Sequence, residues 1–253
     1  MKSFLLSMLF ACSATLASAT SITVLPETST GNAVAARNAW ILSTLGVNWN
    51  PVMLENFEGF GYGPYNSLST GAGTFSVAPG SQAGDPQQSN GTHTDQFTIL
   101  NSSDTPFSGR FNTTSGGSNW LDSNDITRMQ LTTSASTLFF FITDVGDCGG
   151  VLQIQTADGT TYTFPSFSNY AGDGNLYFVG INSASSIGSV KWLNNSGNDG
   201  FGMDDFGTAV DPPPPPPAVP EPASWPVAAA GLLAIPLIRK FRSRSSRSPE
   251  TSA

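Results

Sequence analysis

The chain has 253 residues, only 11% of them charged, and its ten basic residues are outnumbered by eighteen acidic ones. Between Thr20 and Asp211, four basic residues stand against sixteen acidic ones, so this segment has a net charge of about −12. Because phosphate binding needs a basic face, this balance argues against nucleic acid as a partner. Gly, Ser, Thr and Asn dominate the segment, which favours strands and turns over helices.

The first nineteen residues have the pattern of a signal peptide. Lys2 precedes an apolar run over residues 4–11, and Ala17-Ser18-Ala19 is the small-x-small pattern that signal peptidase accepts. We therefore predict an exported protein cleaved after Ala19. A retained anchor fits less well because the run is short, and a lipoprotein site at Cys12 fits less well because Phe10 is bulky there. After cleavage Cys148 is the one remaining cysteine, so no internal disulfide is expected.

One short helix is expected at the start of the mature chain. Over residues 32–45 apolar side chains recur at near-helical spacing, and Gly46 follows as a cap. After this segment the pattern changes to short apolar runs with an alternation of two, which predicts strands. The expected strands lie at residues 75–77, 96–100, 129–131, 137–142, 151–154, 162–164, 176–179 and 189–192.

These strands predict a mainly β protein. Asp158-Gly159 is the clearest hairpin turn, and short strands separated by polar turns favour an antiparallel β-sandwich over alternating strands and helices. We expect a jelly-roll-like sandwich over residues 20–210, with a closed barrel as the alternative. The glycine-rich stretch from Gly61 to Asp95 is expected to be a long surface loop around one strand.

The C-terminal part predicts a stalk and a membrane helix. Six prolines, residues 212–217, must form a stiff polyproline spacer, so we assign residues 211–218 to a stalk. The apolar residues 223–238 are just long enough to span a bilayer. Arg239, Lys240 and Arg242 follow them, which places the domain outside and residues 243–253 in the cytoplasm. On these physical grounds alone the segment is a plain single-span anchor.

The residues around this helix resemble a known sorting signal. The apolar helix and the basic cluster follow a Pro-Glu-Pro box, which is formed by Val219, Pro220, Glu221, Pro222, Ala223, Ser224 and Trp225. Together, residues 219–242 resemble the PEP-CTERM signal of Gram-negative bacteria that produce biofilm and exopolysaccharide. The resemblance implies recognition and processing by an exosortase near the Pro-Glu-Pro box. It also implies an intermediate anchored in the inner membrane, followed by release to the cell surface or outside the cell.

Acidic turns rich in glycine make Ca²⁺ the best-motivated ligand. Calcium takes six to eight oxygen ligands from carboxylates and backbone carbonyls, and such turns supply both. If the first and last strands pair, Glu55 and Glu58 would lie near Asp204 and Asp205. Asp144, Asp147 and Asp199 could form a second cluster. The competing interpretation is that these residues are ordinary turn formers in solvated loops.

Carbohydrate binding is the second hypothesis. Aromatic side chains in polar segments could stack on sugar rings, although most of them, Trp192 above all, are expected to be core residues. The candidates are Tyr62, Tyr65, Trp120, Tyr170 and Trp192.

Catalysis is not expected. His93 is the sole histidine, and no nucleophile elbow, Walker loop or zinc-protease motif occurs. Cys148 lacks the electropositive neighbours of a reactive thiolate. We therefore expect a non-enzymatic cell-surface or extracellular-matrix protein associated with exopolysaccharide. The main rival is a secreted carbohydrate-active enzyme with two convergent carboxylates. Ice adhesion is a minor third option, since no Thr-x-Thr array is present.

Overall fold

The computed structural model describes residues 20–82, 95–103 and 105–210. The expected signal peptide, stalk, sorting signal and membrane helix therefore lie outside the described residues, as does His93. Within them the chain forms one helix, α1 (Thr30–Leu45), and fourteen strands. The strands are β1 (Ser21–Glu27), β2 (Asn50–Glu55), β3 (Gly63–Tyr65), β4 (Ser67–Thr70), β5 (Gly73–Val77), β6 (Phe97–Asn101), β7 (Asn119–Asp122), β8 (Arg128–Thr133), β9 (Thr137–Thr143), β10 (Leu152–Thr156), β11 (Thr161–Thr163), β12 (Leu176–Asn182), β13 (Gly188–Asn194) and β14 (Gly202–Val210).

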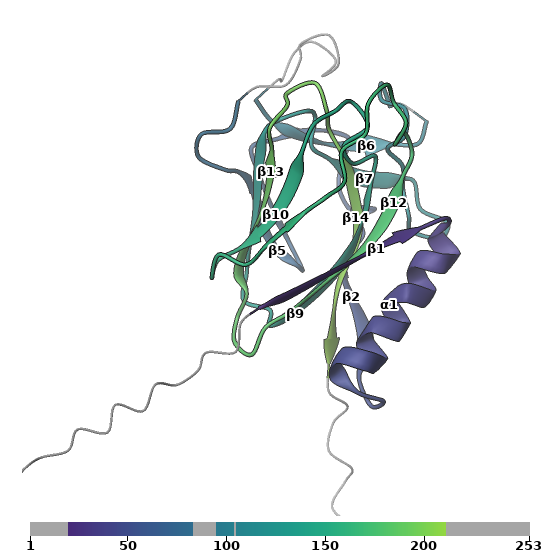
Figure 1. The fold of residues 1–253 in the computed structure, drawn as a ribbon, viewed down its shortest axis with the longest axis vertical. Coiled ribbons are helices and arrows are strands. Elements are labelled where there is room, and N and C mark those ends of the chain that lie inside the picture. The colour runs from purple at the N-terminus through teal and green to yellow at the C-terminus, as the bar shows by residue number, and fades with distance from the viewer. Residues whose placement is uncertain (1–19, 83–94, 104, 211–253) are drawn as a thin grey trace, which may run out of the picture. The chain divides into compact units, whose positions relative to one another are not determined.

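The strands form two antiparallel sheets, so the predicted mainly β, sandwich-like fold with one short helix is confirmed (Figure 1). The larger sheet has eight strands in the order β1-β12-β9-β14-β7-β6-β3, with β2 paired to β14. The smaller has six, in the order β11-β10-β13-β8-β5-β4. The Asp158-Gly159 turn joins β10 to β11 as predicted, and Gly159 takes the positive φ of 87° that such a turn requires.

The last strand occupies the middle of the larger sheet and not its edge. β14 pairs with β9 on one side and with β2 and β7 on the other. The expected pairing of first and last strands is therefore wrong in detail, because β1 pairs with β12. It is the second strand, β2, that meets β14 and sets Glu55 opposite Phe206.

The stretch from Gly61 to Asp95 also differs from the single strand expected there. Its described part holds β3, β4 and β5, with β4 and β5 joined through a short turn. Gly73 in this turn has a φ of 136°, and a Cβ there would collide with the backbone of β8. Short strands with few large apolar residues gave too weak a pattern to be distinguished from a loop.

The core has two apolar layers, which explains why β9 is buried on both faces. Leu138, Phe140 and Ile142 point into the large cluster between the sheets. Phe139 and Phe141 point the other way, into a second cluster under α1. The helix thus covers the outer face of the larger sheet beside β1 and β12 (Figure 1).

The helix itself matches the expectation closely. It begins after Ser29, whose side chain accepts the N–H of Asn32, and Gly46 ends it with a φ of 106°. Trp40 packs directly over Gly180 of β12, where a Cβ would collide with the indole ring. Within the described part of the chain, no helix is both long enough and apolar enough to cross a membrane.

Candidate metal centre

A buried arginine organises the loops at one end of the sandwich. Arg110 lies in the segment between β6 and β7 and is only 6% exposed. Its guanidinium forms three ion pairs, at 3.2 Å to Asp122, 2.7 Å to Asp125 and 3.3 Å to Asp144. The ring of Phe107 lies 3.9 Å from the guanidinium carbon on its face. One side chain therefore connects the end of β7, the turn after it and the turn after β9.

The electrostatics of this network depend on the arginine. Burial lowers the pKa of Arg110, but the charges of Asp122, Asp125 and Asp144 outweigh that effect and hold the pKa above its usual value. Burial raises the pKa of Asp122, and the arginine opposes this rise. Because a buried carboxylate without a partner is expensive, the three aspartates need this cation to stay ionised.

Next to Arg110 lies a group of five residues that we call the acidic centre: Asp144, Asp147, Cys148, Asp173 and Asp199. Potential ligand atoms of Asp147, Cys148 and Asp199 lie within 4.8 Å of one another, and so do those of Asp144, Asp147 and Asp173. Asp147 belongs to both groups and is therefore the middle of the centre. The residues come from the turn after β9 and from the segments that precede β12 and β14.

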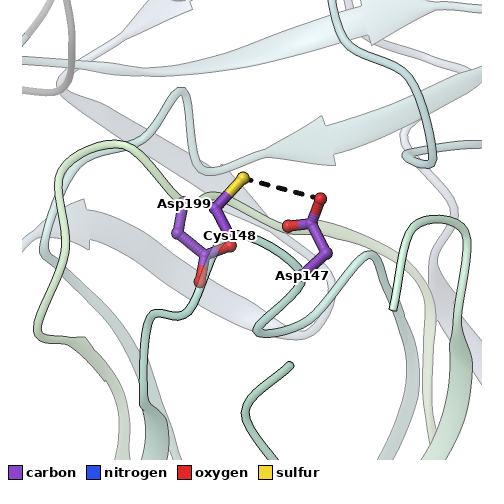
Figure 2. Close-up of side chains that lie close together, drawn as sticks. All are labelled: Asp147, Cys148 and Asp199. Atoms are coloured by element: carbon purple, nitrogen blue, oxygen red, sulfur yellow. Dashed lines mark hydrogen bonds between the residues drawn. The ribbon is translucent and has the colours of Figure 1, made fainter. Parts of the chain in front are cut away.

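Asp199 is the most unusual member of the acidic centre. It is 1% exposed, and neither of its carboxylate oxygens has a hydrogen-bond partner of normal geometry. Burial and the neighbouring Asp147 carboxyl raise the pKa of Asp199 to about 7. Figure 2 shows the Asp147, Cys148 and Asp199 side chains grouped together, with the thiol of Cys148 donating to Asp147 at 3.6 Å. The charge of Arg110 and the N–H of Gly150 oppose the rise but do not cancel it.

Asp144 belongs to the second ligand group of the acidic centre, and both of its carboxylate oxygens have partners. One oxygen pairs with Arg110, and the other accepts the N–H of Gly174 at 3.0 Å. Burial raises the pKa of Asp144 to about 7 against the effect of Arg110, and Asp147 and Asp173 add to the rise. Burial, followed by the charge of Asp147, also raises the pKa of Cys148 to about 12. The cysteine is therefore a protonated hydrogen-bond donor at neutral pH and not a thiolate.

Glycine backbone lets the carboxylates approach the turns this closely. A Cβ at Gly150 would collide with the Asp199 carboxylate, and one at Gly109 would collide with Asp144 and Asp173. A cavity of about 240 Å³ opens beside the centre. Its walls include Phe107, Arg110, Asp144, Asp147, Cys148 and the exposed Tyr170. Asp144, Asp147 and Cys148 of the centre therefore border a cavity, while Asp173 and Asp199 are not part of its lining.

The other predicted acidic group is arranged differently. Glu58 and Asp204 do come together, since the side-chain amide of Asn112 donates to both, at 3.0 and 3.2 Å. Asp204 also accepts the backbone N–H groups of Thr113 and Thr114 at 2.8 and 3.1 Å. Glu58 accepts the N–H groups of Ser118 and Asn119 in the same way.

Glu55 and Asp205 are also occupied with protein donors. Glu55 accepts the N–H groups of Asn56 and Phe57, and Asp205 accepts the hydroxyls of Thr113 and Thr114. Asp204 and Asp205 lie within β14, beside a bulge, and not in the turn expected for them. Their oxygens shape the loop between β6 and β7 through hydrogen bonds, and they form no ligand group like the acidic centre in the described residues.

The aromatic candidates mostly belong to the core. Trp120 and Trp192 are 1% and 0% exposed, as expected for Trp192. Tyr65 is stacked on Phe97 at 6.4 Å between ring centroids. Tyr62 and Tyr170 are exposed, and Tyr170 alone borders the acidic centre. The described residues therefore offer no row of aromatic rings for sugar stacking.

Three residues of the site were missed in the sequence. Arg110 is a single charge in a polar segment, and its partners are 12, 15 and 34 residues away. Asp173 lies in a turn that resembles any solvated loop, and Cys148 was considered only as a nucleophile. Arg110 was the one available signal. It is one of few cations in a very acidic segment, and such a cation is expected to pair with buried carboxylates.

Comparison with known proteins gives no family. No family model matches the chain, and no curated protein matches it. Among solved structures, the enzymatically active domain of tailspike protein 4 of bacteriophage CBA120 aligns with a TM-score of 0.23 and 9% identity. The alignment covers 65% of this chain but only 20% of the tailspike chain. A likeness of this size carries no argument about fold or function.

Proposed function

We propose that this chain is an exported, non-enzymatic protein of the cell surface or extracellular matrix, associated with exopolysaccharide and stabilised by a divalent cation at the acidic centre. The observation that carries the cation is the crowding of Asp199 with Asp147 and Cys148, whose potential ligand atoms lie within 4.8 Å of one another, while the buried oxygens of Asp199 make no hydrogen bond of normal geometry. A bound cation would supply counter-charge to the two carboxylates.

Calcium is the cation that suits the donors. The centre offers carboxylate oxygens of Asp147 with Asp199 in one group and of Asp147 with Asp144 and Asp173 in the other. Carboxylate oxygens are hard ligands, and backbone carbonyls and water can complete a calcium shell. Zinc would prefer the thiolate of Cys148. The carboxylate oxygens of the centre outnumber its single sulfur, which favours a hard cation over zinc.

Titration of the purified full chain with CaCl₂ tests the site. We expect saturable heat with a dissociation constant of about 0.1 to 1 mM, the range of extracellular calcium modules. At calcium concentrations well above that constant, the melting temperature should also rise. Asp199→Asn removes the charge with little change in shape and should abolish both effects. Glu27→Gln, which removes one acid of β1 outside the centre, should leave both unchanged.

Two results would contradict the calcium assignment. One is calcium binding by Asp199→Asn equal to that of the unchanged protein. The other is tighter binding of Zn²⁺ than of Ca²⁺, lost in Cys148→Ser, which would make the centre a thiolate site. Because serine replaces the thiol donor toward Asp147 with a hydroxyl donor of similar size, this variant separates metal ligation from simple packing.

Export and sorting need a separate test, because the residues that predict them lie outside the described ones. Mass spectrometry of the protein recovered from the cell surface should find Thr20 as the first residue and a C-terminus near Glu221. Replacing Glu221 with Gln should reduce surface release, while replacing Glu250 in the tail should not. A surface protein that ends at Ala253 would refute processing at the Pro-Glu-Pro box.

A further inference from the structure

The outer face of the smaller sheet carries a hollow whose charge differs from that of the rest of the domain. The hollow has a volume of about 530 Å³. Its walls combine the polar residues Arg128, Gln153, Gln155, Lys191, Asn194 and Asn195 with the apolar residues Ala78, Pro79, Val151 and Leu193. Among the described residues, neither an acidic side chain nor an aromatic ring is part of its lining. In a segment with a net charge of about −12, a surface of cations and amides is an exception.

Strand register explains why these side chains converge. On β13, Lys191 lies opposite Gln155 of β10 on one side and Gln130 of β8 on the other. Leu193 lies opposite Gln153 and Arg128 in the same way. Side chains two residues apart share a face, so these six residues form two adjacent rows across three strands. Lys191 and Arg128 are diagonal neighbours, a relation that puts backbones about 7 to 8 Å apart.

The two cations of the hollow are available to a ligand, in contrast with the other two of the described domain. Arg110 is buried among three aspartates, and Arg37 lies half-buried with its guanidinium 5.5 Å from the Phe139 ring. Arg128 is exposed, and its guanidinium makes one long hydrogen bond of 3.4 Å to the carbonyl of Pro79, which holds it at the rim. Within the described residues, every ion pair belongs to Arg110.

We propose that this hollow binds an acidic polysaccharide, in which sugar carboxylates pair with Arg128 and Lys191 and sugar hydroxyls bond to the amides of Gln153, Gln155 and Asn195. Gln153 Nε2 also donates to Thr163 at 3.1 Å, and Asn195 Oδ1 accepts the N–H of Val151 at 2.7 Å, so the ligand would use the amide oxygen of Gln153 and the amide nitrogen of Asn195. A guanidinium recognises a carboxylate through two parallel N–H donors, and amides can both donate to and accept from hydroxyls. Without an aromatic ring in the lining, the hollow selects by charge and not by stacking on neutral sugars. The inference rests on the proposed association with exopolysaccharide and gives it a ligand class and a site.

The negative charge of the rest of the domain confines a bound polyanion to the hollow. A polyanion is repelled by the net negative charge of the domain, so it is held only where cations outnumber carboxylates. The attraction acts between exposed groups and is therefore weakened strongly by salt. Binding should be measurable at low ionic strength and largely lost at about 0.5 M NaCl.

Affinity of the purified full chain for polygalacturonate, with dextran as the neutral polymer, tests the site. EDTA is present throughout, so that a cation at the acidic centre cannot bridge to the polymer. We expect binding to polygalacturonate and none to dextran. Arg128→Gln combined with Lys191→Gln should weaken binding on the order of tenfold or more. Both side chains are exposed or partly exposed, so the melting temperature of this variant should stay unchanged.

Matched variants separate this site from other sources of attraction. Arg244→Gln with Arg247→Gln removes the same charge from the tail beyond the sorting signal and should keep the binding. Asp199→Asn should also keep it in EDTA, so failure of the calcium site leaves this proposal standing. Three results would each overturn the proposal. They are full binding by the Arg128 and Lys191 double variant, binding of dextran equal to that of polygalacturonate, and a preference for single-stranded DNA over polygalacturonate.

Discussion

Replacement of Arg110 by methionine is expected to abolish the folded state at neutral pH. The change keeps most of the side-chain volume but leaves Asp122, Asp125 and Asp144 without their shared cation. Removing one partner of a buried ion pair typically costs about 3 to 5 kcal/mol, and here one side chain serves three acids. Since whole domains are stable by only about 5 to 15 kcal/mol, circular dichroism should show loss of the cooperative thermal transition.

Arg37→Met is the matched control for this prediction. It removes a half-buried cation that lies over Phe139 but forms no ion pair in the described residues. We expect it to cost about 1 kcal/mol or less. Arg110→Lys should fall between the two, because a single ammonium cannot replace three directed N–H donors. Melting temperatures of Arg110→Met and Arg37→Met that agree within a few degrees would refute the role given to Arg110.

The second large effect is a loss of stability as pH rises in the absence of calcium. Burial and the neighbouring Asp205 charge raise the pKa of Asp204 to about 8, in spite of the backbone N–H donors around it. Its unfolded value is near 3.9, so between these pH values the folded state binds more protons than the unfolded one. The stability contributed by this group is therefore greatest at acidic pH and falls until pH reaches about 8. Each pH unit in this window costs up to about 1.4 kcal/mol.

Chemical denaturation in EDTA at pH 5, 6, 7 and 8 measures this dependence. The free energy of unfolding should fall steadily over the series, and Asp204→Asn should reduce the slope whatever its effect on absolute stability. Part of the slope should remain, because the pKa values of Asp144 and Asp199 are raised to about 7 and both groups titrate in the same window. Asp158, whose hydrogen bonds from Thr156, Thr20 and Thr160 lower its pKa, acts only below pH 4 and does not disturb the window. A slope unchanged in Asp204→Asn would assign the titration to other groups.

The fold was predictable where side-chain periodicity is strong. The helix was expected from its spacing and its glycine cap, and β9 from an apolar run that is buried on both faces. β14 was missed because Asp204 and Asp205 break the apolar pattern. Both acids are buried, and donors from Thr113 and Thr114 compensate them. β1 was missed because Pro26 and Glu27 are tolerated only at an edge, a position that the sequence alone does not reveal.

The acidic centre was predictable in its composition but not in its geometry. Glycine-rich acidic turns identified Asp144, Asp147 and Asp199 as one group, and the structure gathers Asp147 with Asp199 and Asp144 with Asp173. Which acids would be paired with Arg110 and which would lack a partner depends on contacts between distant turns. Such contacts leave no pattern of local spacing in the sequence. The sequence therefore offers Arg110 as a partner for buried acids but does not reveal which acids it pairs with, or that Asp199 is not one of them.

The position of β14 has a mechanical consequence for a protein held by its C-terminal end. The strand ends at Val210, directly before the expected stalk, and has hydrogen-bonded neighbours on both sides, β9 and β2. A load applied at Val210 acts along the strand, so its inter-strand bonds must be sheared together and cannot open one by one. Survival under such a load depends on the rate of unfolding and not on equilibrium stability. If the smaller sheet holds a polymer and the C-terminal end is attached to the cell, tension between the two is resisted by the most central strand of the larger sheet.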